Sequence, residues 1–215
     1  IEACQKELKA GQKLTYEFIS HRILNGRGKP SSIDTFEKNL SDNIFYNNEG
    51  MARYALAKLD ETSHSREYAP NLWARNEKGL FVWTIEHIFP QGKNIPAYWI
   101  DMIGNGDKEE TQKVYDEMVH CFGNLTLSGY NSKLSNQSFD RKQGKHEANI
   151  LGNKIHIGYK NGLALNNIKF NLNGKQTTLA HADNWTKNHI QSRNSTMVDM
   201  LLKIFKFDFE DLNNV

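Results

Sequence analysis

The chain of 215 residues is 38% hydrophobic and 24% charged, which is typical of a globular protein with a packed core. It has no run of the ~20 apolar residues that a membrane-spanning helix needs, and its charged beginning lacks the pattern of a signal peptide. Its two cysteines, Cys4 and Cys121, give no zinc-ribbon spacing and no disulfide framework, so we expect a protein of the reducing cytoplasm.

Residues 1 to 80 are expected to be helical. The stretch SSIDTFEKNLSDNIF at residues 31–45 offers Ser32 or Asp34 as a helix cap, ahead of apolar residues that recur every four positions. A second helix is predicted over residues 50–61. The residues expected to face the core are Phe36, Leu40 and Ile44 in the first helix and Met51, Tyr54, Ala55 and Leu59 in the second.

A strand pattern follows the helical region. The β-branched and aromatic run LFVWTIEHIF at residues 80–89 predicts a strand that Pro90 ends. Residues 91–106 are expected to form a loop that packs back on the body through Trp99 and Ile100.

A helix, a strand and another helix are predicted next. Residues 107–122 carry acids in their first turn and apolar residues on one face, as a short helix does. Residues 123–129 form a second strand pattern between two glycines, and a helix with a basic end begins at Asn131. The middle of the chain is therefore expected to run strand, excursion, strand and helix.

The last third of the chain predicts hairpins and a closing helix. Residues 150–180 alternate in places and contain Asn-Gly pairs at 161–162 and 173–174, which favour tight turns. An amphipathic helix is predicted over residues 184–207, with Arg193 helping to hold it to the body. The residues on its apolar face are Trp185, Ile190, Met197, Leu201 and Phe205.

The net charge of +2 hides an uneven distribution. Residues 131–175 contain eight basic and two acidic side chains, which gives this segment a charge of +6, so the rest of the chain is acidic. A basic region beside an acidic body is typical of a protein that binds a phosphate backbone. A solvated lysine-rich surface is the alternative interpretation.

Four polar residues lie at the expected ends of the two middle strands and the helix that follows. Glu86 and His87 end the first strand, Asn124 opens the second, and Asn131 begins the helix. Carboxylate and amide oxygens suit Mg²⁺, and an imidazole can accept a proton from water near neutral pH. Adjacent residues of a regular strand point to opposite faces, so a shared site for Glu86 and His87 requires a distorted strand end.

Three motifs together resemble a known family. The sequence IEHIFPQ, then GNLTL, then the pattern Asn131-x4-Asn136-x2-Phe139-x2-Lys142 resembles HNH endonucleases of the ββα-metal type. The resemblance is closest to the C-terminal domain of GmrSD-type restriction proteins, a class that includes SspE-like phage-defence proteins. It extends over residues 84–194, because the segment from Trp185 to Arg193 is similar to the closing helix of that domain.

The resemblance implies roles for the four polar residues. His87 would be the general base, Glu86 and Asn131 would hold one Mg²⁺ or Mn²⁺ ion without an organic cofactor, and Asn124 would orient the histidine or brace the loop. The chain departs from many HNH nucleases in having Glu86 where Asp or His is common, and in lacking paired CxxC zinc knuckles.

Each assignment has a structural alternative. Asn131 is also a good helix cap, Asn124 suits a turn, and His87 alone suits a core or surface position. The other histidines, His120 included, show no metal-ligand spacing and are expected to be structural or exposed. The basic residues predicted to contact DNA phosphate, or else to form a plain basic helix end, are Lys133, Arg141, Lys142 and Lys145.

These observations predict an α+β fold, mostly helical and built around a ββα-metal (HNH) core. We expect a helical region over residues 1–80, the HNH core over 81–146, and a hairpin and closing helix over 147–215, together forming one compact domain. The expected activity is metal-dependent nicking of double-stranded DNA, in a restriction or phage-defence protein with an N-terminal nucleotide-hydrolysing domain. The alternatives are a non-catalytic DNA-binding module, a protein-interaction module, or a nuclease that acts on RNA.

Overall fold

A computed structural model of the chain describes residues 2–11, 15, 18, 32–65, 67–150 and 152–205. The chain divides into two compact units, Ile1–Phe36 and Glu37–Val215. The first unit contains helix α1 (Glu2–Lys9) and the start of α3 (Ile33–Ser41), where the Ser32 hydroxyl accepts a hydrogen bond from the Thr35 amide at 3.2 Å. The predicted cap at Ser32 is confirmed.

Within its described residues, the second unit combines helices with three two-stranded antiparallel sheets, so the fold is α+β. The sheets pair β1 (Thr84–His87) with β2 (Leu125–Ser128), β3 (His146–Ile150) with β4 (Asn153–Ile157), and β5 (Phe170–Leu172) with β6 (Lys175–Thr177). The helices are α4 (Ile44–Asn47), α5 (Glu49–Ser63), α6 (Ala97–Gly104), α7 (Lys108–Met118), α8 (Asn131–Leu134) and α9 (Lys187–Ile204). The short helices are η1 (Phe122–Asn124), η2 (Arg141–Lys145) and η3 (Ala164–Asn167).

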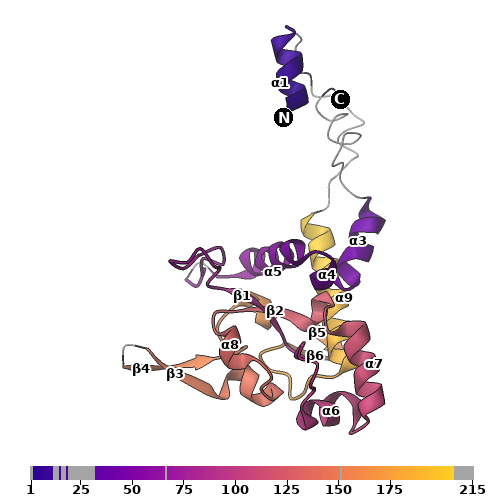
Figure 1. Cartoon of the computed structure of the whole chain (residues 1–215), viewed down its shortest axis with the longest axis vertical. Helices are drawn as coiled ribbons and strands as arrows, with labels where there is room; N and C mark the ends of the chain where they lie inside the picture. Colours follow the sequence, from indigo (N-terminus) through magenta and orange to yellow (C-terminus); the bar gives the residue numbers. More distant parts are fainter. Residues whose placement is uncertain are drawn as a thin grey trace. The chain divides into compact units, whose positions relative to one another are not determined.

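The predicted order of strand, excursion, strand and helix is present in the middle of the chain. Figure 1 shows β1 and β2 side by side, with α5 on one side and α8 on the other. The excursion between the strands carries α6 and α7, and α8 follows β2 after a turn at Gly129–Tyr130. Thr84 pairs with Ser128 and His87 with Leu125, so the end of β1 lies beside the start of β2.

Three expectations about secondary structure are corrected. The predicted loop contains α6, which Pro96 begins and Asn105 ends in a left-handed conformation, although Trp99 is buried as expected. The first strand is only four residues long. On α5, Met51 and Tyr54 are more than a third exposed, because the smaller Ala52 and other alanines face the core in their place.

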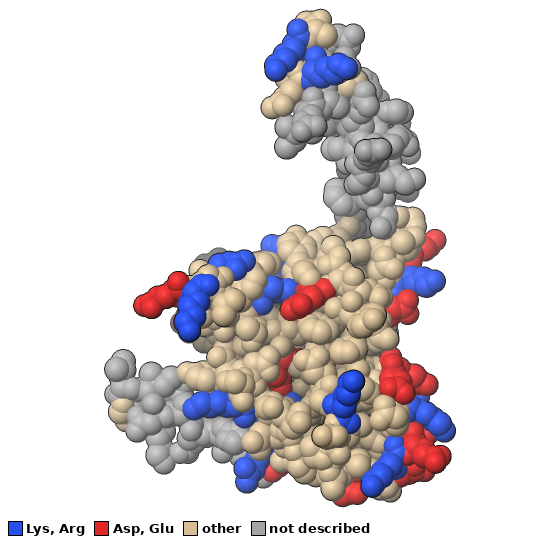
Figure 2. Space-filling model, in the orientation of Figure 1, with Lys and Arg blue, Asp and Glu red and all other residues tan. Residues whose placement is uncertain are grey.

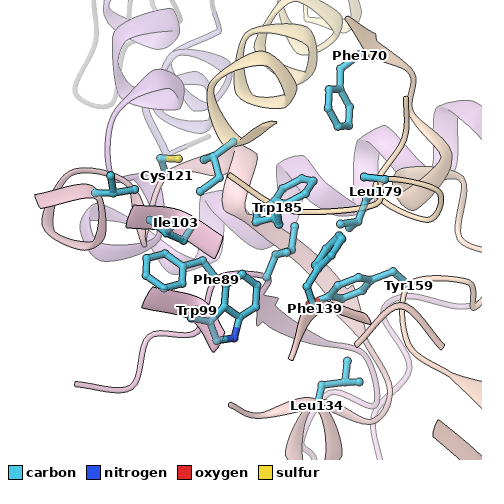
Figure 3. Packing of buried hydrophobic residues seen from close by; sticks show 14 of the residues in the cluster. Phe89, Trp99, Ile103, Cys121, Leu134, Phe139, Tyr159, Phe170, Leu179 and Trp185 are labelled. Carbon is cyan, nitrogen blue, oxygen red and sulfur yellow. The ribbon is translucent and has the colours of Figure 1, made fainter. Parts of the chain in front are cut away.

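The core is aromatic and lies against the closing helix. Phe139 and Trp185 stack with ring centroids 5.6 Å apart, and Phe89 packs beside Trp99 at 5.4 Å (Figure 3). The Phe170 ring packs perpendicular to the Trp185 ring. These residues come from segments far apart in the sequence, so burying them fixes α6, β5 and α9 around one centre.

The segment before β2 is tied to α9 by backbone contacts. Arg193 is fully buried, and its Nη1 donates to the carbonyl oxygens of Gly123 and Leu125, both at 2.8 Å. The Gly123 amide in turn donates to the Asn194 side chain at 2.8 Å. Together with the buried Trp185, Arg193 holds the last helix to the body, as predicted. No helix within the described ranges is both long and apolar enough to cross a membrane.

We predict that Gly123→Ala destabilises the fold by about 1–3 kcal/mol, the usual effect of overpacking a tight contact. A Cβ at this position would lie 2.2 Å from the Ile190 carbonyl oxygen, so α9 would have to move away. Urea unfolding measures the change. Gly129→Ala is the matched control, because a Cβ there meets nothing within 4 Å. Equal stability of the two variants would contradict the close approach of α9 to Gly123.

Candidate active site

The end of β1 directs its side chains to two different environments. Glu86 pairs across the sheet with Thr126, and His87 with Leu125, in a regular antiparallel register. Successive side chains of such a strand point to opposite faces. The two residues predicted to share a site therefore contact different partners.

Glu86 forms a buried ion pair with Lys142 of η2. Its Oε1 accepts a hydrogen bond from Lys142 Nζ at 2.6 Å, and both side chains are almost fully buried. The same ammonium donates to the carbonyl oxygens of His87 at 2.8 Å and Ile88 at 3.2 Å. Lys142 therefore neutralises the carboxylate and satisfies the backbone at the end of β1.

Burial is the main influence on the ionisation of this pair. It raises the pKa of Glu86 to about 7, although the charge and hydrogen bond of Lys142 act in the opposite direction. Burial also lowers the pKa of Lys142, whereas the charge and hydrogen bond of Glu86 act to raise it. The attraction between the two groups offsets only part of the cost of removing both from water.

The ion pair bears on two predictions, a DNA contact for Lys142 and a metal ligand for Glu86. Lys142 was predicted to contact DNA phosphate, but its ammonium is enclosed and already bonded to three oxygens. Glu86 was predicted to hold a metal ion, yet a buried cation already occupies its Oε1. A divalent ion at the same carboxylate would be repelled by that ammonium. The Glu86 side chain therefore does not fit a metal ligand in this arrangement.

His87 lies among aromatic rings on the other face of the strand. Its Nε2 is 3.1 Å from Nδ1 of His120, and the Phe45 ring packs nearly perpendicular to it with centroids 4.6 Å apart. The side chain is only 4% exposed. Burial lowers the pKa of His87 to about 3, and the charges of His120 and Lys142 add to that shift. The ring is therefore neutral at pH 7.

The lowered pKa of His87 predicts that this residue makes the fold more sensitive to acid. A histidine whose pKa falls on folding contributes stability above its unfolded pKa of 6.5, and that stability is lost as the pH falls toward the folded value. The loss that His87 contributes between pH 7.5 and pH 5 is about 2 kcal/mol, while protonation of Glu86 over the same range acts in the opposite direction. Urea unfolding of the native chain and of His87→Gln at both pH values measures the His87 contribution as the difference between the two chains. An equal change with pH in the two chains would contradict the shift at His87.

Asn124 braces the loops around the site. Its Oδ1 accepts hydrogen bonds from the Phe89 amide at 2.8 Å and the Trp185 indole at 3.2 Å. Its Nδ2 donates to the carbonyl oxygens of Phe89 and Val119, both at 2.9 Å. This placement matches the bracing alternative, and none of these hydrogen bonds joins its side chain to His87.

Asn131 links α8 to β1. Its Nδ2 donates to the Ile85 carbonyl oxygen at 2.6 Å, so the first residue of α8 is fastened beside the strand that carries His87. The cap position of α8 belongs to Tyr130, so the capping alternative for Asn131 is not observed. Its amide oxygen, the atom that a metal ion would need, makes no hydrogen bond within the described part of the chain.

The predicted metal site is therefore only partly assembled. Of its two predicted ligands, Asn131 keeps an amide oxygen without a hydrogen bond in the described residues, whereas Oε1 of Glu86 is paired with the Lys142 ammonium. Among the residues that the structure describes, no group of three His, Cys, Asp or Glu side chains is arranged to hold a metal ion. Glu86 and Asn131 do not by themselves form a complete metal site.

The remaining predicted DNA contacts differ in placement. Lys133 on α8 and Arg141 at the start of η2 are exposed. The side chain of Lys145 lies outside the described residues. Figure 2 shows acidic side chains gathered over α7, at the right-hand edge of the view. Lys133 and Arg141 remain available to contact a phosphate backbone.

Sequence reasoning missed two contacts of the site. Lys142 lies 56 positions from Glu86, and His120 lies 33 positions from His87, so no local spacing connects either pair. The only available signal is that Lys142 ends one family motif while Glu86 lies in another.

Comparison with known proteins agrees with the motifs. Residues 31–200 match the family described as GmrSD restriction endonucleases, C-terminal domain. No curated protein and no solved structure matched the chain. The match covers well over half of the sequence and includes β1, β2, α8 and most of α9. The chain therefore belongs to the family of GmrSD restriction endonuclease C-terminal domains.

Proposed function

We propose that this chain is a DNA endonuclease of the HNH type that cuts one strand of a duplex, with His87 as the general base. The observation that carries the proposal is a neutral imidazole at the end of β1, beside a helix that Asn131 fastens to the same strand. Membership of a restriction endonuclease family supports hydrolysis of DNA as the reaction class.

The chemistry needs a group that removes a proton from water. The lone pair of His87 would take that proton while the water oxygen attacks phosphorus and the bond from phosphorus to the leaving oxygen breaks. A pKa near 3 makes a weak base in the free protein. An anionic phosphodiester beside the ring favours the protonated form, so substrate binding would raise the pKa toward neutrality.

Dependence on Mg²⁺ or Mn²⁺ is part of the proposal. Mg²⁺ commonly binds few protein groups and completes its coordination with substrate phosphate and water. In this chain the Asn131 amide oxygen is the predicted ligand that stays available, and Glu86 is assigned to the ion pair instead. When bound, the ion would offset negative charge on the phosphate oxygens.

The experiment is a supercoiled-plasmid assay of the native chain with Mg²⁺, with Mn²⁺ and with EDTA. We expect relaxed circles with either metal and none with EDTA. Linear DNA should appear only after relaxed circles accumulate, because one site cuts one strand at a time. Relaxation at the same rate in EDTA would contradict metal dependence, and linear product from the first turnover would contradict nicking.

The engagement of Glu86 by Lys142 favours a second candidate, a DNA-binding module without catalysis. Such a module would bind duplex DNA with an affinity that falls as salt rises, through Lys133 and Arg141. It would leave plasmid supercoiled with every metal. In either case we propose that the chain acts in restriction together with an N-terminal nucleotide-hydrolysing domain.

A further inference from the structure

His120 is the polar side chain that meets the ring of His87. We propose that His120 is a positioning residue for phosphodiester hydrolysis. Its Nδ1 accepts a hydrogen bond from the Nε2–H of His87, which leaves Nδ1 of His87 as the atom that takes the proton from water. This inference rests on the proposed function of His87 as the general base.

The contact between His87 and His120 allows two placements of the shared hydrogen, on one ring nitrogen or on the other. Nε2 of His87 and Nδ1 of His120 are 3.1 Å apart, and the rings stand nearly perpendicular, at 81°. A neutral imidazole carries a proton on one nitrogen only. If His87 donates, its Nδ1 has a free lone pair. If His120 donates, Nδ1 of His87 carries the proton and the ring cannot act as a base at that atom.

The surroundings favour donation by His87. No hydrogen bond in the described part of the chain engages Nδ1 of His87, so a proton on this nitrogen would have no acceptor there. Free imidazole side chains prefer the tautomer with hydrogen on Nε2, and donation by His87 gives both rings that tautomer.

Phe45 on α4 fixes the two rings relative to each other. It stacks on His120 with centroids 5.4 Å apart and planes within 18°, and it packs nearly perpendicular to the His87 ring with centroids 4.6 Å apart. The Phe45 amide also donates to the His120 carbonyl oxygen at 3.3 Å. His120 is thus held by backbone and ring contacts, so its Nδ1 stays directed at His87.

Two variants separate the acceptor from the packing. His120→Asn keeps an acceptor near the position of Nδ1, and His120→Phe keeps an aromatic ring against Phe45 without any acceptor. In the plasmid assay we expect His120→Phe to slow nicking by about 10–100-fold, the usual effect of losing a group that orients a ligand or base. His120→Asn should restore most of the native rate. Circular dichroism melting checks that both variants are folded.

Nitrogen-15 NMR of protein labelled at its histidines identifies the tautomer of His87, and the measurement does not depend on nuclease activity. We expect His87 in the native chain and in His120→Asn to be protonated at Nε2 only, and His120→Phe to show a mixture of tautomers. A proton on Nδ1 of native His87 would overturn the proposal. So would a native nicking rate in His120→Phe.

One further outcome is distinguishable. If His87 is protonated at Nε2 but the native chain cuts no DNA, the contact is supported and the proposed function fails, which removes the catalytic consequence.

Discussion

Replacing His87 with alanine is expected to slow plasmid nicking by about 10²–10⁴-fold, the usual contribution of a general base. The ring is neutral, its Nε2 is engaged by His120, and it stands at the end of the strand to which α8 is fastened. Its removal leaves DNA binding in place, since the exposed Lys133 and Arg141 are unchanged. The expected result is therefore a loss of rate at saturating DNA without a comparable loss of affinity.

The measurement is the initial rate of relaxed-circle formation with Mn²⁺, paired with a filter-binding assay in the same buffer. His181→Ala is the control, because His181 is an exposed histidine away from β1. Nicking by His87→Ala at the native rate would remove His87 from the mechanism. Loss of DNA binding together with activity would instead mean that the substitution damages the fold, which the melting temperature would report.

Local patterns in the sequence predicted much of the fold. The acids after Asp107 predicted α7, and the Asp107 side chain does accept hydrogen bonds from the first amides of that helix. The Asn173–Gly174 pair predicted the β5–β6 turn, where both residues have positive φ angles of 50° and 81°. The apolar face of the closing helix predicted α9. In each case the signal lies within about one turn or one hairpin.

Contacts between distant segments could not be predicted in this way. Sequence motifs brought Glu86, His87 and Asn131 to one region, and the family assignment that they implied is confirmed. The alternation of a regular strand indicated that Glu86 and His87 would face opposite sides. It did not indicate which partners they would meet, because these come from η2 and from the loop after α7. Whether Glu86 acts as a metal ligand or as an ion-pair partner depends on which cation the fold brings to its carboxylate.

The ion pair between Glu86 and Lys142 gives the largest expected effect on stability. Lys142→Met should destabilise the chain by about 3–5 kcal/mol, because it leaves a buried carboxylate without its partner. The carbonyl oxygens of His87 and Ile88 lose a donor as well. Without Lys142 the carboxyl pKa should rise above its present value of about 7. Since protonation relieves the unpaired charge, the loss of stability should be smaller at pH 5 than at pH 8.

Urea unfolding of Lys142→Met, Glu86→Gln and the double variant at both pH values tests this pair. The double variant should be more stable than Lys142→Met alone, because it no longer buries an unpaired charge. The substitution Arg141→Ala, one position away and exposed, should reduce DNA affinity with little change in stability. The opposite pattern, in which Lys142→Met weakens DNA binding and leaves unfolding unchanged, would return Lys142 to the DNA-binding surface and free Glu86 to hold a metal ion.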